Sequence, residues 1–118
     1  MWEIETALLE DWIMSLPSDD YDLLFAALEV LSSEGPALGR PLVDTIKGST
    51  VKNLKELRPG SSGRSEVRVL FAFDPARRAI MLVADDKAGN WQRWYRKNIP
   101  VAEQRYRDHL EELHRRQP

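Results

Sequence analysis

Cysteine is absent from the 118 residues of this sequence. Disulfide frameworks, thiolate metal sites and cysteine nucleophiles are therefore excluded. Histidine occurs only at His109 and His114, and a spacing of five residues does not place both rings on one helix face, as a metal-ligand pair requires. Because glycine-rich phosphate loops, dinucleotide fingerprints and serine-hydrolase elbows are also missing, we expect neither a metal nor an organic cofactor.

Long apolar runs are missing too, since no stretch approaches the length of a membrane span. The first residues, MWEIETALLEDW, are acidic where a signal peptide has a basic leader and an apolar core. We therefore expect a soluble cytoplasmic protein without a membrane partner. With 42% hydrophobic residues, the chain is expected to form one domain over residues 1–118.

Lysine and arginine are absent from the first third of the chain. Residues 1–39 contain nine acids and no basic residue, whereas all 17 basic residues follow, together with ten acids. The later part therefore carries a formal charge of about +7, although the net charge of the chain is -2. Either one side of the molecule attracts polyanions, or the uneven charge is only an ordinary solvated surface.

The stretch from Leu54 to Lys87 organises the rest of the chain. Apolar runs at residues 53–58, 65–74 and 79–84 are separated by short turns, which favours an antiparallel meander of three strands. The second run alternates strictly, as a strand with two different faces does. One predicted face carries Val67, Val69, Phe71 and Phe73, and the other carries Glu66, Arg68, Leu70 and Ala72.

Helical patterns precede and follow this meander. Residues 2–5 are a short candidate strand, and residues 6–17 and 18–35 have the spacing of a helical hairpin. Residues 37–50 are predicted to be a loop along the sheet edge, and residues 88–98 a polar-aromatic loop. Pro100 is predicted to open the last helix. The expected class is α+β with the order (β)ααβββα: a small antiparallel sheet packed against an N-terminal helical hairpin and a C-terminal helix.

Arg68 stands within an otherwise apolar strand. Burial of an unpaired guanidinium is costly, so this side chain requires an anionic partner. Two alternatives follow: an internal pair with Glu56 or Glu66, or a bound phosphate, which the planar guanidinium suits. More basic residues lie near the ends of the predicted strands, where the meander can bring them together: Arg58, Arg64 and Lys87.

Proteins that bind single-stranded RNA combine a cationic groove with aromatic rings on which bases stack. Residues 88–98 have this composition, because three aromatic residues alternate with three basic ones. They are Trp91, Trp94 and Tyr95, with Arg93, Arg96 and Lys97. The alternative is that the tryptophans cap the core, which leaves Tyr95 as the aromatic residue expected at the surface.

The order of these segments resembles the HigB branch of the RelE/ParE-like toxins, and in particular its phage-derived members. The resemblance is carried by LKELR at 54–58, EVRVLFAFD at 66–74, Lys87 after the last strand and RWYRKNIP at 93–100. It implies a RelE-like fold and the toxin of a type II toxin-antitoxin pair. Such a toxin is a ribosome-dependent endonuclease that cuts mRNA without a metal. The 2′-hydroxyl attacks the adjacent phosphate, which leaves a cyclic phosphate and a 5′-hydroxyl.

Matched by position, the resemblance implies that Arg68 holds the scissile phosphate and that Lys87 and Tyr95 complete the catalytic set. We expect the RNA to be bound by Lys55, Arg58, Arg64, Trp94 and Arg96. The family often has paired lysines where this chain has Lys55 beside Glu56, so the general base is unassigned. The implied partners are the ribosome, its mRNA and a helix-turn-helix antitoxin of the HigA type, with operator DNA reached only through that antitoxin.

Two other functions stay open at this point. The domain could be an inactive relative that binds the antitoxin and acts as a co-repressor, or a gyrase inhibitor like other members of the wider superfamily. The strand arginines and the aromatic segment suit RNA better than a protein target.

Overall fold

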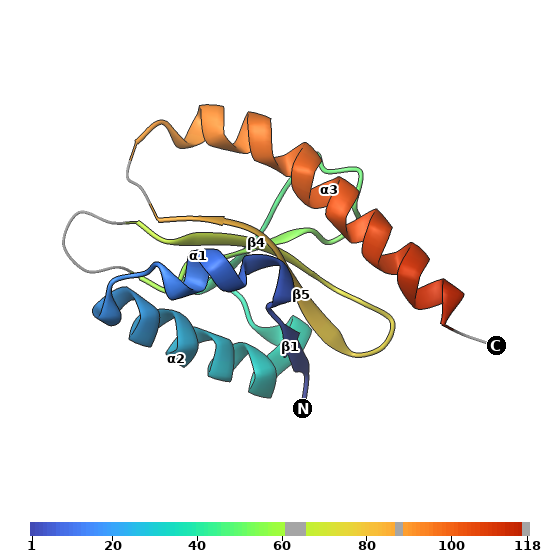
Figure 1. Ribbon diagram of the computed structural model, residues 1–118, viewed down its shortest axis with the longest axis horizontal. Coiled ribbons are helices and arrows are strands. Elements are labelled where there is room, and N and C mark those ends of the chain that lie inside the picture. The colour runs from blue at the N-terminus through green and yellow to red at the C-terminus, as the bar shows by residue number, and fades with distance from the viewer. Residues whose placement is uncertain (61–65, 87–88, 117–118) are drawn as a thin grey trace.

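The computed structural model describes residues 1–60, 66–86 and 89–116 (Figure 1). Its centre is a five-stranded sheet with the order β1-β5-β4-β3-β2. The strands are β1 (Glu3–Glu5), β2 (Val43–Thr45), β3 (Lys55–Leu57), β4 (Arg68–Phe73) and β5 (Arg78–Asp85). Strand β1 runs parallel to β5, and the other neighbours are antiparallel. The predicted meander of β3, β4 and β5 is confirmed.

The helices lie on both faces of this sheet. A short 3₁₀ turn, η1 (Ala7–Leu9), leads into α1 (Glu10–Met14), and α2 (Ser18–Glu34) is followed by η2 (Gly35–Ala37). Helices α1 and α2 cover one face, and the long helix α3 (Trp91–Arg115) crosses the other (Figure 1). The arrangement confirms the α+β class and is compatible with a RelE-like fold.

Each face of the sheet has its own hydrophobic core, and β4 contributes alternate residues to the two. Val69 and Phe71 pack in the core with residues of α1 and α2, whereas Leu70 and Ala72 pack in the core with Ala102 of α3. The predicted alternation is confirmed. Because Arg68 is two residues before Leu70, the strand period directs its side chain to the α3 face.

The end of α2 is fixed by Gly35, which is also where the predicted helical segment 18–35 ends. This glycine has a φ of +59°, a left-handed conformation that side chains rarely adopt. A Cβ atom at this position would also lie 2.3 Å from the indole nitrogen of Trp2. The chain can therefore turn here and bring β1 close to the end of α2 only with glycine.

Helix α3 begins earlier than the sequence predicts. The prediction of a loop over residues 88–98 and of Pro100 as the first helical residue is wrong, because α3 starts at Trp91 and contains Pro100 in its interior. Asn90 caps the helix, since its side-chain oxygen accepts a hydrogen bond from the backbone N–H of Arg93 at 3.1 Å. The basic and aromatic segment is thus helical.

An interior proline removes one helical hydrogen bond, so the continuity of α3 needs a compensating contribution. Trp94, Tyr95 and Ile99 provide it, because all three pack against the core on the α3 face. Figure 1 shows that the first turns of α3 run in a different direction from the rest, as expected for a helix bent at a proline.

Strand β2 falls within residues 37–50, which the sequence predicts as a loop along the sheet edge. It extends the sheet beyond β3, and Val43 pairs with Leu57. Val43 is buried, with an exposed fraction of 2%. A strand of three residues is too short to give a periodic signal, which explains why the pattern did not reveal it.

Candidate functional site

A chain of hydrogen bonds links the sheet to the first turns of α3. The guanidinium of Arg68 donates from Nη1 to the hydroxyl of Tyr95 and from Nη2 to Glu66 Oε1, the latter at 2.5 Å. The Tyr95 hydroxyl donates to Glu56 Oε2 at 2.5 Å, and Glu56 Oε1 accepts from Arg58 Nε at 2.6 Å. Five side chains therefore form one continuous network, with an arginine near each end and a tyrosine in the middle.

Strand alternation explains why these side chains meet. Glu56 pairs with Leu70 in the sheet, so it points to the α3 face together with Arg58, two residues later. Glu66 and Arg68 share that face for the same reason. Tyr95 lies one helical turn after Trp91, which directs both rings toward the sheet. The network is thus a consequence of one sheet face and one helix face packed together.

Glu56 and Arg68 are the most deeply placed members of the network. The side chain of Glu56 is 1% exposed and that of Arg68 is 14% exposed, whereas Arg58 and Glu66 are each 46% exposed. A buried carboxylate is tolerated when both oxygens are hydrogen-bonded, as those of Glu56 are. The network therefore has a buried centre and two accessible ends.

Aromatic rings complete the surroundings of Arg68. Its guanidinium carbon lies 4.3 Å from the centroid of the Trp91 ring and 5.7 Å from that of Tyr95, both within cation–π range. Trp94 packs edge-on against both rings, with centroid distances of 5.1 Å to Trp91 and 5.3 Å to Tyr95. Within the described residues, Arg68 Nε is buried and has no hydrogen-bond partner.

The surroundings keep the hydroxyl of Tyr95 protonated. Burial raises the pKa of the Tyr95 hydroxyl, and the hydrogen bond to Glu56 raises it further, against a smaller opposite effect of Arg68. The phenol is therefore protonated at neutral pH. The indole of Trp91 and the guanidinium of Arg68 lower the pKa of Glu66, and the bond to Glu56 raises the pKa of Arg58.

The structure brings together three of the residues that the sequence selects: Arg58, Arg68 and Tyr95. The internal-pair alternative for Arg68 is confirmed, because Arg68 bonds directly to Glu66 and reaches Glu56 through Tyr95. The phosphate alternative stays a proposal.

Other selected residues lie apart from the network. Lys55 precedes Glu56 and so points to the opposite sheet face, where its Nζ donates to Thr45 Oγ1 at 3.3 Å. Trp94 is partly buried against the core, as the core-cap alternative predicts. Arg96 is exposed on α3. Arg64 and Lys87 lie outside the described residues.

Two features of the site were not selected from the sequence. Trp91 is the ring closest to the Arg68 guanidinium, and Glu56 is the acceptor for Tyr95. A helical reading of residues 91–98 would have placed Trp91 and Tyr95 four residues apart on one face. The strand alternation of residues 56 and 58 was the available signal for Glu56.

A groove of about 270 Å³ opens onto this network, and Glu56, Arg58 and Tyr95 line it. Among residues 1–60, 66–86 and 89–116, no group of three or more histidine, aspartate or glutamate side chains is placed to hold a metal ion. In the same ranges, no helix has the length and apolar character needed to cross a membrane.

Comparisons with known proteins give the relationships of the chain. A family described as "Phage derived protein Gp49-like" matches residues 11–107. The chain is 54% identical over 117 residues to "Putative toxin HigB2" of Mycobacterium tuberculosis strain H37Rv, covering 99% of this chain and 58% of that protein. It is 49% identical over 106 residues to "Putative toxin HigB3" of the same strain, covering 90% of each. The chain thus spans little more than half of the first relative and most of the second.

Proposed function

The chain belongs to the phage-derived Gp49-like family and is a HigB-type toxin, and from this premise we propose that it cleaves mRNA on the ribosome as the toxin of a type II toxin-antitoxin pair. The proposed partner is a helix-turn-helix antitoxin of the HigA type, through which operator DNA would be reached. The proposed place of action is the cytoplasm, where translating ribosomes are found.

The observation that carries this proposal is Arg68, held between Tyr95 and Trp91 on the sheet. A guanidinium suits the charge that develops on a phosphate during cleavage, and a fixed position makes its stabilisation effective. In the proposed step, the 2′-oxygen forms a bond to phosphorus while the bond from phosphorus to the 5′-oxygen breaks. The products are a 2′,3′-cyclic phosphate and a 5′-hydroxyl.

Tyr95 is the proposed acid for the leaving 5′-oxygen. Its hydroxyl is protonated at neutral pH and so carries a proton to give, although the raised pKa makes it a weaker acid than an ordinary tyrosine. This proton is donated to Glu56 in the resting site, so in the proposed step the hydroxyl turns from Glu56 toward the leaving oxygen. The proton of the 2′-hydroxyl needs a separate acceptor; the family resemblance leaves this general base unassigned, and with Tyr95 as the acid, Lys87 is the remaining candidate. Arg58, on the groove that opens onto Tyr95, is the proposed second contact for the RNA backbone.

A phosphate that binds Arg68 competes with Glu66 for the guanidinium. Its Nη2 now bonds to Glu66, which is half exposed, whereas its Nη1 bonds to the more deeply placed Tyr95. The phosphate is therefore expected to displace Glu66 and to leave the contact with Tyr95 in place. This exchange keeps the proposed acid next to the bound phosphate.

The experiment is induced expression in bacteria, with growth recorded and mRNA 5′ ends mapped. The unchanged protein is expected to arrest growth and to cut translated mRNA at codon boundaries. Arg68→Ala is expected to lower cleavage by roughly 100-fold or more, the usual effect of losing a group that stabilises transition-state charge. Arg107→Ala is the control, because Arg107 is exposed on the same helix and its bonds go to Gln104 and Thr50.

The alternatives give different results in this experiment. Growth arrest that persists in Arg68→Ala would refute the proposed mechanism, provided that the variant is folded by circular dichroism. Induction of the DNA-damage response with intact mRNA would identify a gyrase inhibitor. Binding to the antitoxin without any effect on translation would identify a co-repressor.

A further inference from the structure

We infer that a groove beside the first turns of α3 binds an unpaired base of single-stranded RNA next to the cleaved phosphate. This inference rests on the proposed function and adds a second binding site to it. The groove has a volume of about 510 Å³, which is within the usual range for small-molecule sites. It is lined by Asp85 of β5 and by Asn90, Arg93, Trp94, Lys97 and Asn98 of α3 and its cap.

Helical spacing separates this groove from the one that opens onto the Arg68 network. Positions 90, 93, 94, 97 and 98 follow one face of a helix, and this face borders the end of β5. Tyr95 and Ile99 lie on a neighbouring face, which borders β2 and β3. Trp94 and Tyr95 therefore form the wall between the two grooves, and a strand of RNA that contacts one groove can continue into the other.

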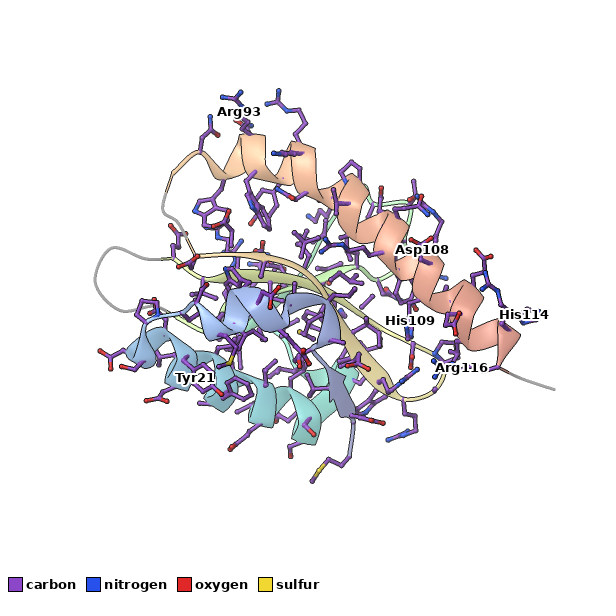
Figure 2. All side chains as sticks on the ribbon, in the orientation of Figure 1. Tyr21, Arg93, Asp108, His109, His114 and Arg116 are labelled. Carbon is purple, nitrogen blue, oxygen red and sulfur yellow. The ribbon has the colours of Figure 1, made fainter. Side chains whose placement is uncertain are left out.

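The charge of the groove favours an anionic strand. Arg93 and Lys97 outnumber the one carboxylate, Asp85, and neither cation has an ion-pair partner within the described residues. Figure 2 shows that Arg93 projects outward from the first turn of α3, away from the sheet. The first turn contains no acid, so the positive end of the helix dipole adds to this cation instead of being neutralised. This arrangement is unfavourable by itself and becomes favourable when a phosphate is bound.

The other groups in the groove suit a base. The Trp94 ring lines the groove, where an aromatic ring suits a stacked base, and its contacts with Trp91 and Tyr95 hold it in place. Asn98 Nδ2 donates to the Trp94 carbonyl, and Asn90 Oδ1 accepts from the Arg93 backbone. Within the described residues, the side-chain oxygen of Asn98, Oδ1, and the side-chain amino group of Asn90, Nδ2, have no hydrogen-bond partner. One acceptor and one donor are therefore available for the edge of a base.

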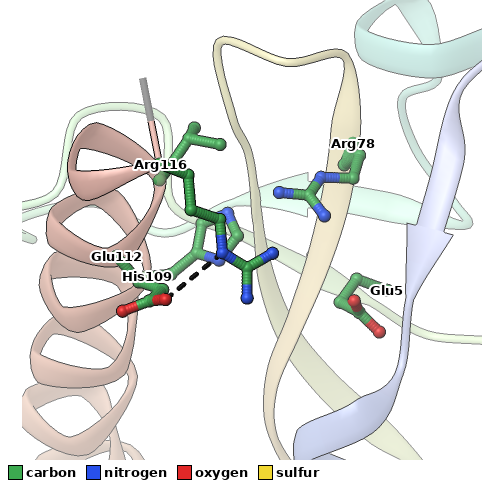
Figure 3. Close-up of a pocket in the computed structure, with 6 residues that line it drawn as sticks. Glu5, Arg78, His109, Glu112 and Arg116 are labelled. Atoms are coloured by element: carbon green, nitrogen blue, oxygen red, sulfur yellow. Dashed lines mark hydrogen bonds and ion pairs between the residues drawn. The ribbon is translucent and has the colours of Figure 1, made fainter. Parts of the chain in front are cut away.

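A cavity at the other end of α3 lacks these features. Figure 3 shows a cavity of about 120 Å³ in which Arg78 and Arg116 lie across from each other, with Glu5 and Glu112 also on its wall. Arg116 bonds to Glu112 at 3.2 Å, and Arg78 bonds to the buried Asp74 at 3.3 Å. Because these cations are already paired and acids are equally frequent, this cavity does not favour an RNA strand.

The test measures binding of a short, labelled, single-stranded 2′-O-methyl RNA, which lacks the attacking hydroxyl, by fluorescence anisotropy. Copies of this RNA with one abasic position each are compared with the complete strand. For the unchanged protein, one abasic position is expected to weaken binding by about 5- to 150-fold, the usual effect of losing one stacked base. Trp94→Leu is expected to bind that abasic RNA and the complete RNA equally.

Lys97→Ala provides a test that does not depend on core packing, because Lys97 is exposed. Loss of one phosphate contact is expected to reduce the slope of log affinity against log salt concentration by about 0.7. Arg107→Ala, the control on the same helix, is expected to keep the slope of the unchanged protein.

Three results would overturn the inference: equal binding of the complete strand and every abasic strand, equal salt slopes for Lys97→Ala and Arg107→Ala, or no binding of the RNA by the unchanged protein. None of them would refute the proposed function, because that depends on growth arrest and its loss in Arg68→Ala. Conversely, a base-binding groove in a protein that does not cut mRNA would refute only the proposed function.

Discussion

Replacement of Tyr95 by phenylalanine removes a single oxygen atom that joins two parts of the candidate site. This hydroxyl accepts a hydrogen bond from Arg68 and donates one to the buried carboxylate of Glu56. The aromatic ring stays, and so do its contacts with Trp91 and Trp94. Tyr95→Phe therefore tests the hydroxyl separately from the packing of α3.

The expected effect on activity is much larger than the effect on stability. Glu56 Oε2 loses its donor, and an unsatisfied buried group typically lowers the free energy of unfolding by about 1–3 kcal/mol. Each kcal/mol corresponds to a decrease in Tm of roughly 4 °C for a domain of this size. Loss of a general acid is expected to lower the cleavage rate by about 100- to 10,000-fold.

Tyr106→Phe is the matched control. The Tyr106 hydroxyl also bonds to an acceptor that is partly buried, the carbonyl oxygen of Phe73 at 2.7 Å, and burial raises the pKa of Tyr106 as it does that of Tyr95. Tyr106 is packed in the same core as Tyr95 but lies about three helical turns farther along α3, away from the residue that contacts Arg68. Its replacement is expected to lower Tm by a similar amount and to leave cleavage unchanged.

The assay is cleavage of mRNA on purified translating ribosomes, combined with thermal melting of each variant. If Tyr95→Phe cleaves within threefold of the unchanged protein while remaining folded, the hydroxyl is not the acid. If both variants lose activity only in proportion to their unfolded fractions, the role of Tyr95 is structural and the proposed step is refuted.

Two further predictions concern ion pairs. Glu66→Gln removes the charge that competes with a phosphate for Arg68, so affinity for single-stranded RNA is expected to rise by about two- to fivefold. Glu111→Gln, which removes an exposed charge elsewhere, is the control. Unchanged affinity in Glu66→Gln would contradict the replacement of Glu66 by phosphate. Burial alone would raise the pKa of Asp74, but bonds from His109, from Arg78 and from the backbone of Ala76 lower it below its ordinary value. A lowered pKa in the folded state stabilises the protein above the unfolded pKa of about 4, and this stabilisation is lost as pH falls through the folded pKa. Urea unfolding at several acidic pH values is therefore expected to show a steeper loss of stability for the unchanged protein than for Asp74→Asn, and equal slopes would contradict it.

Much of the sheet could be predicted because its strands have different environments on their two faces. Val69 and Phe71 alternate with Leu70 and Ala72. This pattern predicts which residues share a face of the sheet, and it places Arg68 on the same face as Leu70 and Ala72. Strand β2 has only three residues and obtains its order from pairing with β3, which no local pattern records. The sequence therefore predicted the strand whose buried residues alternate, β4, and missed β2, whose strand conformation depends on pairing with β3.

The start of α3 could not be predicted for a related reason. Proline at the first helical position is common, so Pro100 is a strong local signal for a helix start. In the structure, the cap at Asn90 and the packing of Trp94 and Tyr95 against the core outweigh that signal. These contributions come from the tertiary structure, and they place the aromatic residues over the sheet instead of in a loop.

The pairing of charges suggests how RNA would approach the site. Arg58 and Arg68 are each neutralised by a carboxylate at 2.5–2.6 Å, so the network itself attracts a distant phosphate only weakly. Arg93 and Lys97 lack an ion-pair partner within the described residues and lie at the end of α3 where the helix dipole is positive. Attraction from a distance would therefore act through the groove that Arg93 and Lys97 line. The phosphate would replace Glu66 at Arg68 once the strand is bound. This order predicts that raising the salt concentration slows association more strongly in the unchanged protein than in Lys97→Ala, while Glu66→Gln changes mainly the rate of dissociation.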